Sequence, residues 1–403
     1  MDRRLSDTRL GGAPLARRPV GRSPRSAGDK GKVGRQTSTV SRMAEESLYY
    51  ADYLQLDKLL SAQVLESERA GETIHDEMLF VIVHQAYELW FKQILWEIDD
   101  LLVIFGRDLV DEQDMGTALS RLRRIVEIQT ILIQQVAVLE TMTPLDFLDF
   151  RDHLFPASGF QSAQFRFVEN KLGMRREDRL RLAGASYTAR FTPEDRETVE
   201  ASEHGPSLFD LVEQWLERTP FLESGGFQFR EAFQEAVRAR LEADREVVAH
   251  NPNLTPEERE VQLKEFALTM EQYEALFDEV KHAEQQKAGR RRLSHRAFQA
   301  ALFINLYRDQ PALHEPYQML ESLMDIDEGF TAWRHRHAQM ALRMIGRRIG
   351  TGGSAGAKYL EKSAERSRIF GDLFDLSTFL IPRDSRPPLP RDIVEAMRFR
   401  YQG

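Results

Sequence analysis

Two histidines each lie in the middle of an apolar helical face, about 250 residues apart in the sequence. His337 shares its stripe with residues three, four or seven positions away, which are Trp333, Met340, Ala341 and Met344. His84 follows an apolar run and has Phe80 four positions before it, on the same face. Each could be a hydrogen-bonded core histidine. Together they could instead hold a metal or haem between two helices, with one neutral imidazole as ligand and the other beside the open coordination position.

Two other segments could bind an anion. Arg151 precedes a turn of small residues at 156–162, and its guanidinium could pair with a ligand carboxylate or with a carboxylate of the chain itself. The run Gly350–Gly356 follows a helix rather than a strand and lacks the lysine of a phosphate-binding loop, which argues against nucleotide binding. Its backbone N–H groups and the Thr351 hydroxyl could still bind an anion, although a flexible helix C-terminal loop is an equal interpretation.

Two Glu-x-x-His pairs, Glu72–His75 and Glu279–His282, have the spacing used in di-iron carboxylate bundles. The signal is weak, because the first pair precedes its helix and the second lies in a charged stretch. The chain has no cysteine, which excludes disulfides, thiol nucleophiles, iron–sulfur clusters and thiolate-ligated haem.

The elements that must position these residues are helical almost everywhere from residue 50 onward. Asp76 is expected to cap a helix that runs to about Phe105, and the run Met78–Val83 is apolar all round, which predicts a central, buried helix. A second core helix is indicated by apolar residues spaced three and four apart, which are Ile125, Ile128, Leu132, Val136 and Leu139. His335 lies between two arginines on a different face from His337, so one of the two histidines should point inward and the other outward.

Further helices are predicted toward the C-terminus. Thr255-Pro256-Glu257-Glu258 is a helix start, and the stripe that follows holds Phe266, Met270, Tyr273, Leu276, Phe277 and Val280. Another helix runs from Ser294 to Leu306, and a last long one spans Pro316 to Ile349 with a break near 325–329. Residues 183–207 are polar and are expected to form a loop or insertion. Period-2 alternation is missing, so the fold class is all-α.

Composition and charge limit the possible partners. The 403 residues are 42% hydrophobic and 30% charged, and the longest apolar run is far too short to span a bilayer. Residues 1–43 carry a net charge of +8 and no aromatic residue, whereas the rest of the chain carries −17. We expect 1–43 to be a disordered basic extension, with a targeting segment or a start codon assigned too early as alternatives. The acidic body argues against nucleic acid as a partner.

Five segments of this sequence resemble the tryptophan 2,3-dioxygenase family: 75–93 (through FVIVHQAYELWFKQ), 146–166 (DFLDFRDHLFPASGFQSAQFR), 322–327, 333–360 and 372–383. The resemblance runs in order from about Tyr49 to Arg383, with 183–290 similar only loosely and 1–43 outside it. It implies a single helical haem dioxygenase domain at 44–403, with 183–290 as a helical insertion. It further implies haem b, a cytoplasmic homotetramer (a dimer of dimers), and conversion of L-tryptophan and O₂ to N-formyl-L-kynurenine, with neither membrane nor nucleic acid as a partner.

The resemblance also implies roles for individual residues. His337 would be the axial iron ligand, and His84 the distal, catalytic histidine near the indole N–H. Arg151 would bind the substrate carboxylate, and Thr351 the ammonium or carboxylate. The remaining substrate-binding positions are Phe80, Val81, Ile82, Val83 and Phe147, together with Tyr50 and Tyr53 from a neighbouring subunit. The remaining haem-pocket positions are Ser158, Gly159, Arg166, Trp333 and Tyr359.

Departures from the family are mild, with Ala355 where serine is common and Phe147 where some relatives carry tyrosine. Three other classes stay open. A haem sensor or carrier would share His337 but would not need the Arg151–Thr351 pair, a di-iron oxidase would use the Glu-x-x-His pairs, and a helical interaction module would need no cofactor. The related indoleamine 2,3-dioxygenases fit the HQAYELWFKQ and GTGGSAG runs less well.

Overall fold

The computed structural model describes residues 48–179, 186–346, 348 and 368–398, and for 269–272, 274 and 275 the backbone alone. The chain divides into two compact units, Met1–Ala62 and Gln63–Gly403. In the first, α1 (Tyr50–Leu54) and α2 (Leu56–Leu60) bury no residue. The second unit holds the other elements.

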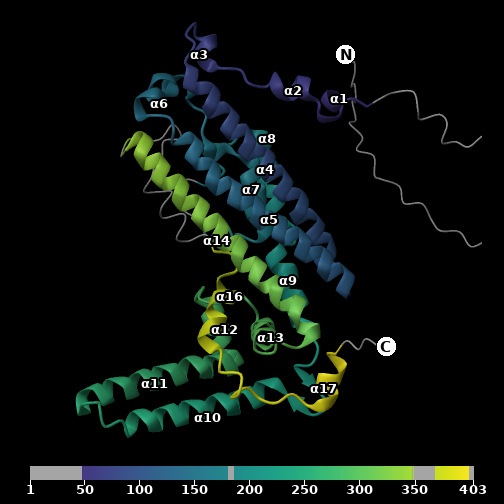
Figure 1. Cartoon of the computed structure of the whole chain (residues 1–403), viewed down its shortest axis with the longest axis vertical. Helices are drawn as coiled ribbons and strands as arrows, with labels where there is room; N and C mark the ends of the chain where they lie inside the picture. The colour runs from purple at the N-terminus through teal and green to yellow at the C-terminus, as the bar shows by residue number, and fades with distance from the viewer. Residues whose placement is uncertain (1–47, 180–185, 347, 349–367, 399–403) are drawn as a thin grey trace, which may run out of the picture. The chain divides into compact units, whose positions relative to one another are not determined.

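Three long helices form the core of the second unit. α4 (His75–Phe105) and α14 (Pro311–Ile345) both pack against α5 (Glu112–Leu139), which is drawn between them in Figure 1. The five α5 residues predicted to face the core are at most 4% exposed, because their spacing places them on one helical stripe. The all-α prediction is therefore confirmed, with a two-stranded antiparallel hairpin, β1 (Glu223–Ser224) and β2 (Phe227–Gln228), as the only sheet among the described residues.

Shorter helices complete the second unit. Those that precede the hairpin are α3 (Glu66–Arg69), α6 (Pro144–Arg151), η2 (Asp152–Leu154), η3 (Gly159–Gln161), α7 (Ala163–Leu172), α8 (Pro193–Ala201), η4 (Ser202–His204) and α9 (Leu208–Glu217). Those that follow it are α10 (Phe229–Ala249), α11 (Pro256–Phe277), α12 (Glu279–Lys287), α13 (His295–Leu306), α16 (Gly371–Asp375), η5 (Leu376–Phe379) and α17 (Arg391–Ala396). No single described helix is long and apolar enough to cross a membrane, and only the bent pair Glu112–Leu139 and Pro144–Leu154 passes that test together.

The predictions for α4 need two corrections. The helix begins at His75 with Ile74 as its N-cap, so Asp76 does not cap it. The run Met78–Val83 is not buried all round, because Met78 is 38% and Ile82 48% exposed. An apolar run alone does not show which face meets a neighbouring helix, and here α5 covers only one side.

The last long helix also differs from its prediction. α14 begins at Pro311, five residues before Pro316, and continues without a break to Ile345. Gly329, which suggested a break, lies instead where α14 and α5 approach closely: a Cβ atom there would be 2.5 Å from Oε1 of Gln129. The glycine thus marks close helix packing rather than a helix end.

Two predicted helix starts are confirmed, and the predicted apolar stripe that follows the first of them is wrong at its end. The Thr255 hydroxyl accepts from Glu258 N, and Ser294 caps α13. The stripe ending at Val280 is interrupted, because α11 ends at Phe277 and Val280 is 69% exposed.

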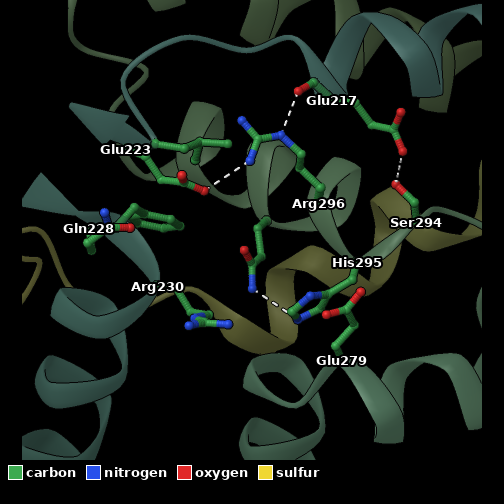
Figure 2. Close-up of a pocket in the computed structure, with 11 residues that line it drawn as sticks. Glu217, Glu223, Gln228, Arg230, Glu279, Ser294, His295 and Arg296 are labelled. Carbon is green, nitrogen blue, oxygen red and sulfur yellow. Dashed lines mark hydrogen bonds and ion pairs between the residues drawn. The ribbon is translucent and has the colours of Figure 1, made fainter.

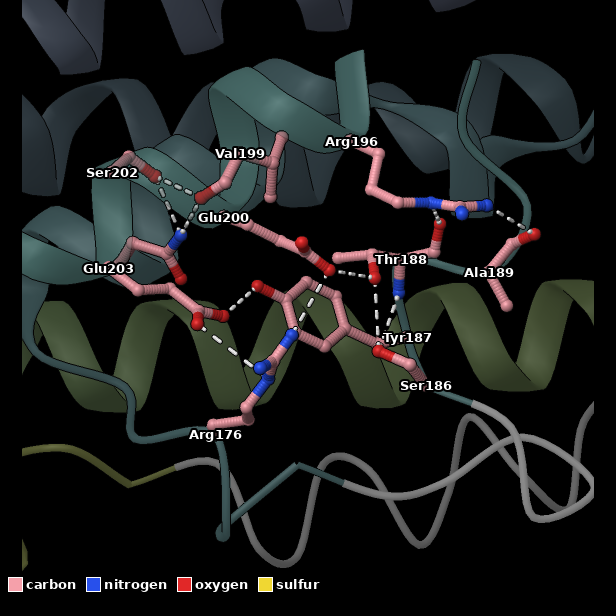
Figure 3. Close-up of polar contacts among 11 residues, drawn as sticks. Arg176, Ser186, Tyr187, Thr188, Ala189, Arg196, Val199, Glu200, Ser202 and Glu203 are labelled. Atoms are coloured by element: carbon pink, nitrogen blue, oxygen red, sulfur yellow. Dashed lines mark hydrogen bonds and ion pairs between the residues drawn. The ribbon is translucent and has the colours of Figure 1, made fainter. Parts of the chain in front are cut away.

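Residues 183–207, predicted to be a loop or insertion, are not a plain loop, because their described part contains α8 and η4, held by the polar contacts of Figure 3. The Tyr187 hydroxyl donates to Glu203, and Thr188 donates to Glu200 at 2.7 Å. The polar residues of this stretch form hydrogen bonds between segments. Polarity in the sequence alone cannot distinguish such residues from those of a solvated loop.

Candidate functional site

Helices α4 and α14 bring the two predicted histidines together. His84 lies near enough to His337 to help lower the pKa of the latter. A series of aromatic rings also connects them: Tyr87 lies 6.4 Å from His84 and 5.9 Å from Trp333, and Trp333 lies 5.7 Å from His337, measured between ring centroids. His335 is exposed, so the prediction that one of the two neighbouring histidines faces inward is confirmed.

His84 is held as a neutral imidazole of defined tautomer. Burial lowers its pKa below 6.5, against the opposing effect of the Phe80 carbonyl. Its Nδ1 lies 2.7 Å from that carbonyl oxygen, which can only accept a hydrogen bond. Nδ1 therefore carries the proton, and Nε2 is left as an acceptor for an N–H group.

His337 is also neutral near pH 7. Burial, with a smaller contribution from His84, lowers its pKa to about 4. The Trp333 ring stacks on it with an interplanar angle of 8°. Within the described part of the chain, no hydrogen bond reaches the His337 ring, so its unprotonated nitrogen can act as a metal ligand.

The Trp333 indole is itself fixed by aromatic neighbours. Its ring lies 5.2 Å from Phe165 and 5.9 Å from both Tyr87 and Phe91. Burial raises the pKa of Tyr87 to about 12, and the nearby indole N–H opposes that rise. This buried N–H nevertheless makes no hydrogen bond of ordinary geometry within the described residues. Packing rather than hydrogen bonding therefore orients Trp333.

An aromatic cluster lies beside His84. Phe80 stacks at 4.0 Å from His84 and lies 5.8 Å from Phe147 and 5.5 Å from Phe150. Phe80 and His84 share a face because they are four residues apart on α4.

The residues between Phe80 and His84 are arranged around the rest of α4. Successive helical residues are rotated by about 100°, so Ile82 lies opposite the face of Phe80 and His84, and Val81 and Val83 flank that face. Ile82 is 48% exposed, and Val83 is buried in the core.

Arg151 is the last residue of α6 and is half-buried. Ser158 caps η3, whose first residue is Gly159. Tyr50 and Tyr53 are exposed on α1 of the first unit. Thr351, Tyr359 and the glycine run 350–356 lie outside the described residues.

A buried ionic cluster was missed in the sequence. Glu169 accepts from Arg166 and Arg334 at 2.8 Å each, and also from Arg179. Burial alone would raise the pKa of Glu169, but the three guanidinium groups hold it well below its usual range. Arg334 directly follows Trp333, so this cluster fixes α14 beside His337. The only signal in the sequence was the Arg166–Glu169 spacing of three on a helix.

The histidines of the two Glu-x-x-His pairs do not lie in a di-iron site among the described residues. His75 begins α4 and is exposed, whereas His282 is buried and its Nε2 donates to the Leu293 carbonyl at 2.9 Å. Among the residues with defined positions, no group of three His, Asp or Glu side chains could hold a metal ion.

A polar cavity of about 480 Å³ lies where α10, α12 and α13 begin, and Glu279 of the second Glu-x-x-His pair is the only candidate functional residue singled out in the sequence that lines it. Figure 2 shows that its polar groups largely bind each other. Arg296 pairs with Glu223 at 3.0 Å, the Ser294 hydroxyl donates to Glu217 at 2.6 Å, and Gln299 lies 3.0 Å from His295. We assign no substrate group to it.

The fold and the site define a class: an all-helical protein with one buried, neutral histidine able to bind a metal or haem iron, and a second histidine beside an aromatic cluster. The family model for tryptophan 2,3-dioxygenase matches residues 35–380. The chain therefore belongs to the tryptophan 2,3-dioxygenase family.

Curated relatives agree with this family. A tryptophan 2,3-dioxygenase of Bdellovibrio bacteriovorus is 49% identical, covering 88% of this chain and 99% of the relative. One from Dictyostelium discoideum is 44% identical over 91% and 92% of the two chains. Tryptophan 2,3-dioxygenase B of Danio rerio is 47% identical over 88% and 87%.

Proposed function

We propose that this protein is an oxidoreductase that cleaves the indole C2–C3 bond of L-tryptophan with O₂ and forms N-formyl-L-kynurenine, the first step of tryptophan degradation. Family membership supports the reaction. The observation that carries the proposal is the meeting of His84, on the face it shares with Phe80, with the neutral His337 of α14. A core histidine pair would be expected to satisfy both rings internally, whereas here each keeps a nitrogen for a ligand.

The proposed cofactor is haem b, whose iron the His337 imidazole would hold. The residues fit this group, since His337 is neutral, lacks a hydrogen bond within the described chain and is oriented by Trp333. When bound, ferrous haem supplies the one-electron chemistry that lets O₂ react with a closed-shell indole. Ser158, Gly159, Arg166 and Tyr359 are proposed as surrounding positions.

The chain's own residues would bind and orient the indole. Phe80 and Phe147 offer aromatic faces to the ring, and Nε2 of His84 accepts the indole N–H. Both oxygen atoms enter the product without net loss of a proton. His84 therefore acts mainly by orienting the substrate rather than as an obligatory base.

A zwitterionic amino acid needs one cationic and one polar partner. Arg151 lies one position after Phe150 at the end of α6, and its planar guanidinium can bind a carboxylate through two parallel hydrogen bonds. Thr351 is proposed as the second partner.

The proposed assembly is a homotetramer, a dimer of dimers, in the cytoplasm. Its support is an exposed apolar stripe on α4, formed by Met78, Ile82, Leu89, Trp96 and Val103. The last four are spaced by seven residues, as in helices that pack lengthwise against a second long helix. A contiguous apolar strip of this kind indicates a protein interface, and a second copy is the proposed occupant. Tyr50 and Tyr53 are proposed to reach the site of a neighbouring subunit.

The activity can be tested with purified protein reconstituted with haem, reduced with ascorbate and given L-tryptophan in air. Haem-dependent absorbance of N-formylkynurenine is the expected result. A normal haem spectrum without product would refute the proposed reaction and favour a sensor or carrier. Failure to bind haem would refute the role of His337.

A further inference from the structure

Helix α6 presents its functional residues on one face. Its start is fixed by a capping box, in which the Thr143 hydroxyl accepts from Asp146 N and Asp146 accepts from Thr143 N at 2.8 Å. Phe147, Phe150 and Arg151 follow at spacings of three and four, so they face the same way. This face packs against α4 and α14, beside which α6 lies in Figure 1.

Phe150 is the ring behind this face. It has no solvent exposure, whereas Phe80 and Phe147 are only partly buried. Its ring meets Phe80 edge-on at 5.5 Å and 63°, and Phe147 edge-on at 5.4 Å and 86°. Each of the two partly buried rings therefore rests on the same buried third ring.

We propose that Phe150 is a positioning residue that determines specificity for the indole, by setting the spacing of Phe80 and Phe147. This inference rests on the proposed function. Phe80 and Phe147 are 5.8 Å apart, and both would retreat if the ring behind them were smaller. The two rings would then hold an unsubstituted indole less firmly and leave more room for a substituted one.

The test is Phe150→Leu, measured as selectivity rather than as rate. Haem-loaded protein is titrated without O₂ by equilibrium dialysis, once with L-tryptophan and once with ring-methylated L-tryptophans. The quantity compared is the dissociation constant of the methylated tryptophan divided by that of L-tryptophan. One methyl group in a fitted apolar pocket changes affinity about tenfold or more, so we expect Phe150→Leu to lower this ratio by about tenfold.

Phe303→Leu is the matched control. Phe303 is equally buried and packs on two rings, Phe229 at 5.1 Å and Tyr307 at 4.9 Å, in a cluster formed by α10 and α13. The same atoms are removed there, so a general loss of stability would affect both variants, whereas the selectivity ratio should change only in Phe150→Leu.

Each outcome decides the matter. A ratio unchanged in Phe150→Leu, or changed equally in Phe303→Leu, overturns the inference. If Phe150→Leu does not fold, Phe150→Met keeps most of the volume, and its ratio should fall at least twofold because a flexible chain replaces a rigid ring. An unchanged ratio there also overturns the inference. Wild-type protein that binds no L-tryptophan refutes the proposed function itself, which is a separate result.

Discussion

Gly329 on α14 gives a stability prediction whose sign can be derived from the structure. Glycine to alanine inside a helix normally stabilises by up to about 1 kcal/mol, because glycine loses more backbone entropy on folding. At Gly329, however, the new Cβ would lie 2.5 Å from Oε1 and 2.7 Å from Cδ of Gln129. Gln129 is 1% exposed, and its Nε2 donates to the Ile326 carbonyl at 2.9 Å.

The side chain of Gln129 must therefore move, and a buried amide then loses its acceptor. Such a loss costs about 1–3 kcal/mol, and overpacking adds about 1–3 kcal/mol. After the propensity gain of about 1 kcal/mol, Gly329→Ala should lower the free energy of unfolding by about 3 kcal/mol. Since His337 lies eight residues further along α14, haem affinity should fall as well.

The assay is denaturant unfolding at one fixed protein concentration, because oligomerisation makes stability depend on concentration. Gly116→Ala on α5 is the matched control. A Cβ there would meet nothing within 4 Å, so this variant should gain about 0.5–1 kcal/mol. In the double variant Gly329→Ala/Gln129→Ala, the penalty of the added methyl group should largely disappear. If Gly329→Ala stabilises the protein as Gly116→Ala does, the close approach is not real and the reasoning is refuted.

Four further changes test the site and the assembly. Arg151→Ala should weaken tryptophan binding by up to about 3 kcal/mol, the value of a charged hydrogen bond, and raise KM in steady-state kinetics. His84→Ser should reduce turnover without abolishing it, because the imidazole orients the indole rather than removing an essential proton. Burial raises the pKa of Asp327 to about 6, so protonation stabilises the folded state as the pH falls from 6 toward 4. The unfolding free energy of the wild type should therefore rise by about 2 kcal/mol relative to Asp327→Asn between pH 7 and pH 4. Trp96→Glu, at a side chain 73% exposed on α4, should shift the protein to smaller species in light scattering.

Each of these has a clear contrary result. An unchanged KM and kcat in Arg151→Ala would remove that residue from the substrate site. Complete loss of turnover in His84→Ser, with haem retained, would indicate essential acid–base chemistry. A pH-independent difference for Asp327→Asn would contradict its raised pKa, and an unaltered mass for Trp96→Glu would place the interface elsewhere.

Much of the fold follows from short-range pattern. The stripe through Ile125 and Val136 predicts a buried face because helical spacing alone determines which residues coincide. The same reasoning separates His337 from His335. Capping residues such as Ser294 mark a helix start because the hydroxyl satisfies a free backbone N–H at the first turn.

What could not be predicted depends on partners distant in sequence. Gly329 reads as a helix break until Gln129, on another helix, is seen beside it. The polar stretch at 183–207 resembles a loop in the sequence. Nothing in the sequence indicates that Glu200 and Glu203 accept hydrogen bonds from Thr188 and Tyr187. Likewise, a single-chain pattern does not show that Ile82 stays about half exposed.

The central claim is that His337 supports the insertion of both atoms of O₂ into L-tryptophan. The most direct test supplies oxygen-18 gas to haem-reconstituted wild type, His335→Ala and His337→Ala, and weighs the product by mass spectrometry. Wild type and His335→Ala should form N-formylkynurenine carrying both labelled atoms, and His337→Ala should bind little haem and form none. Doubly labelled product from His337→Ala, or product with an oxygen taken from water in the wild type, would contradict the claim.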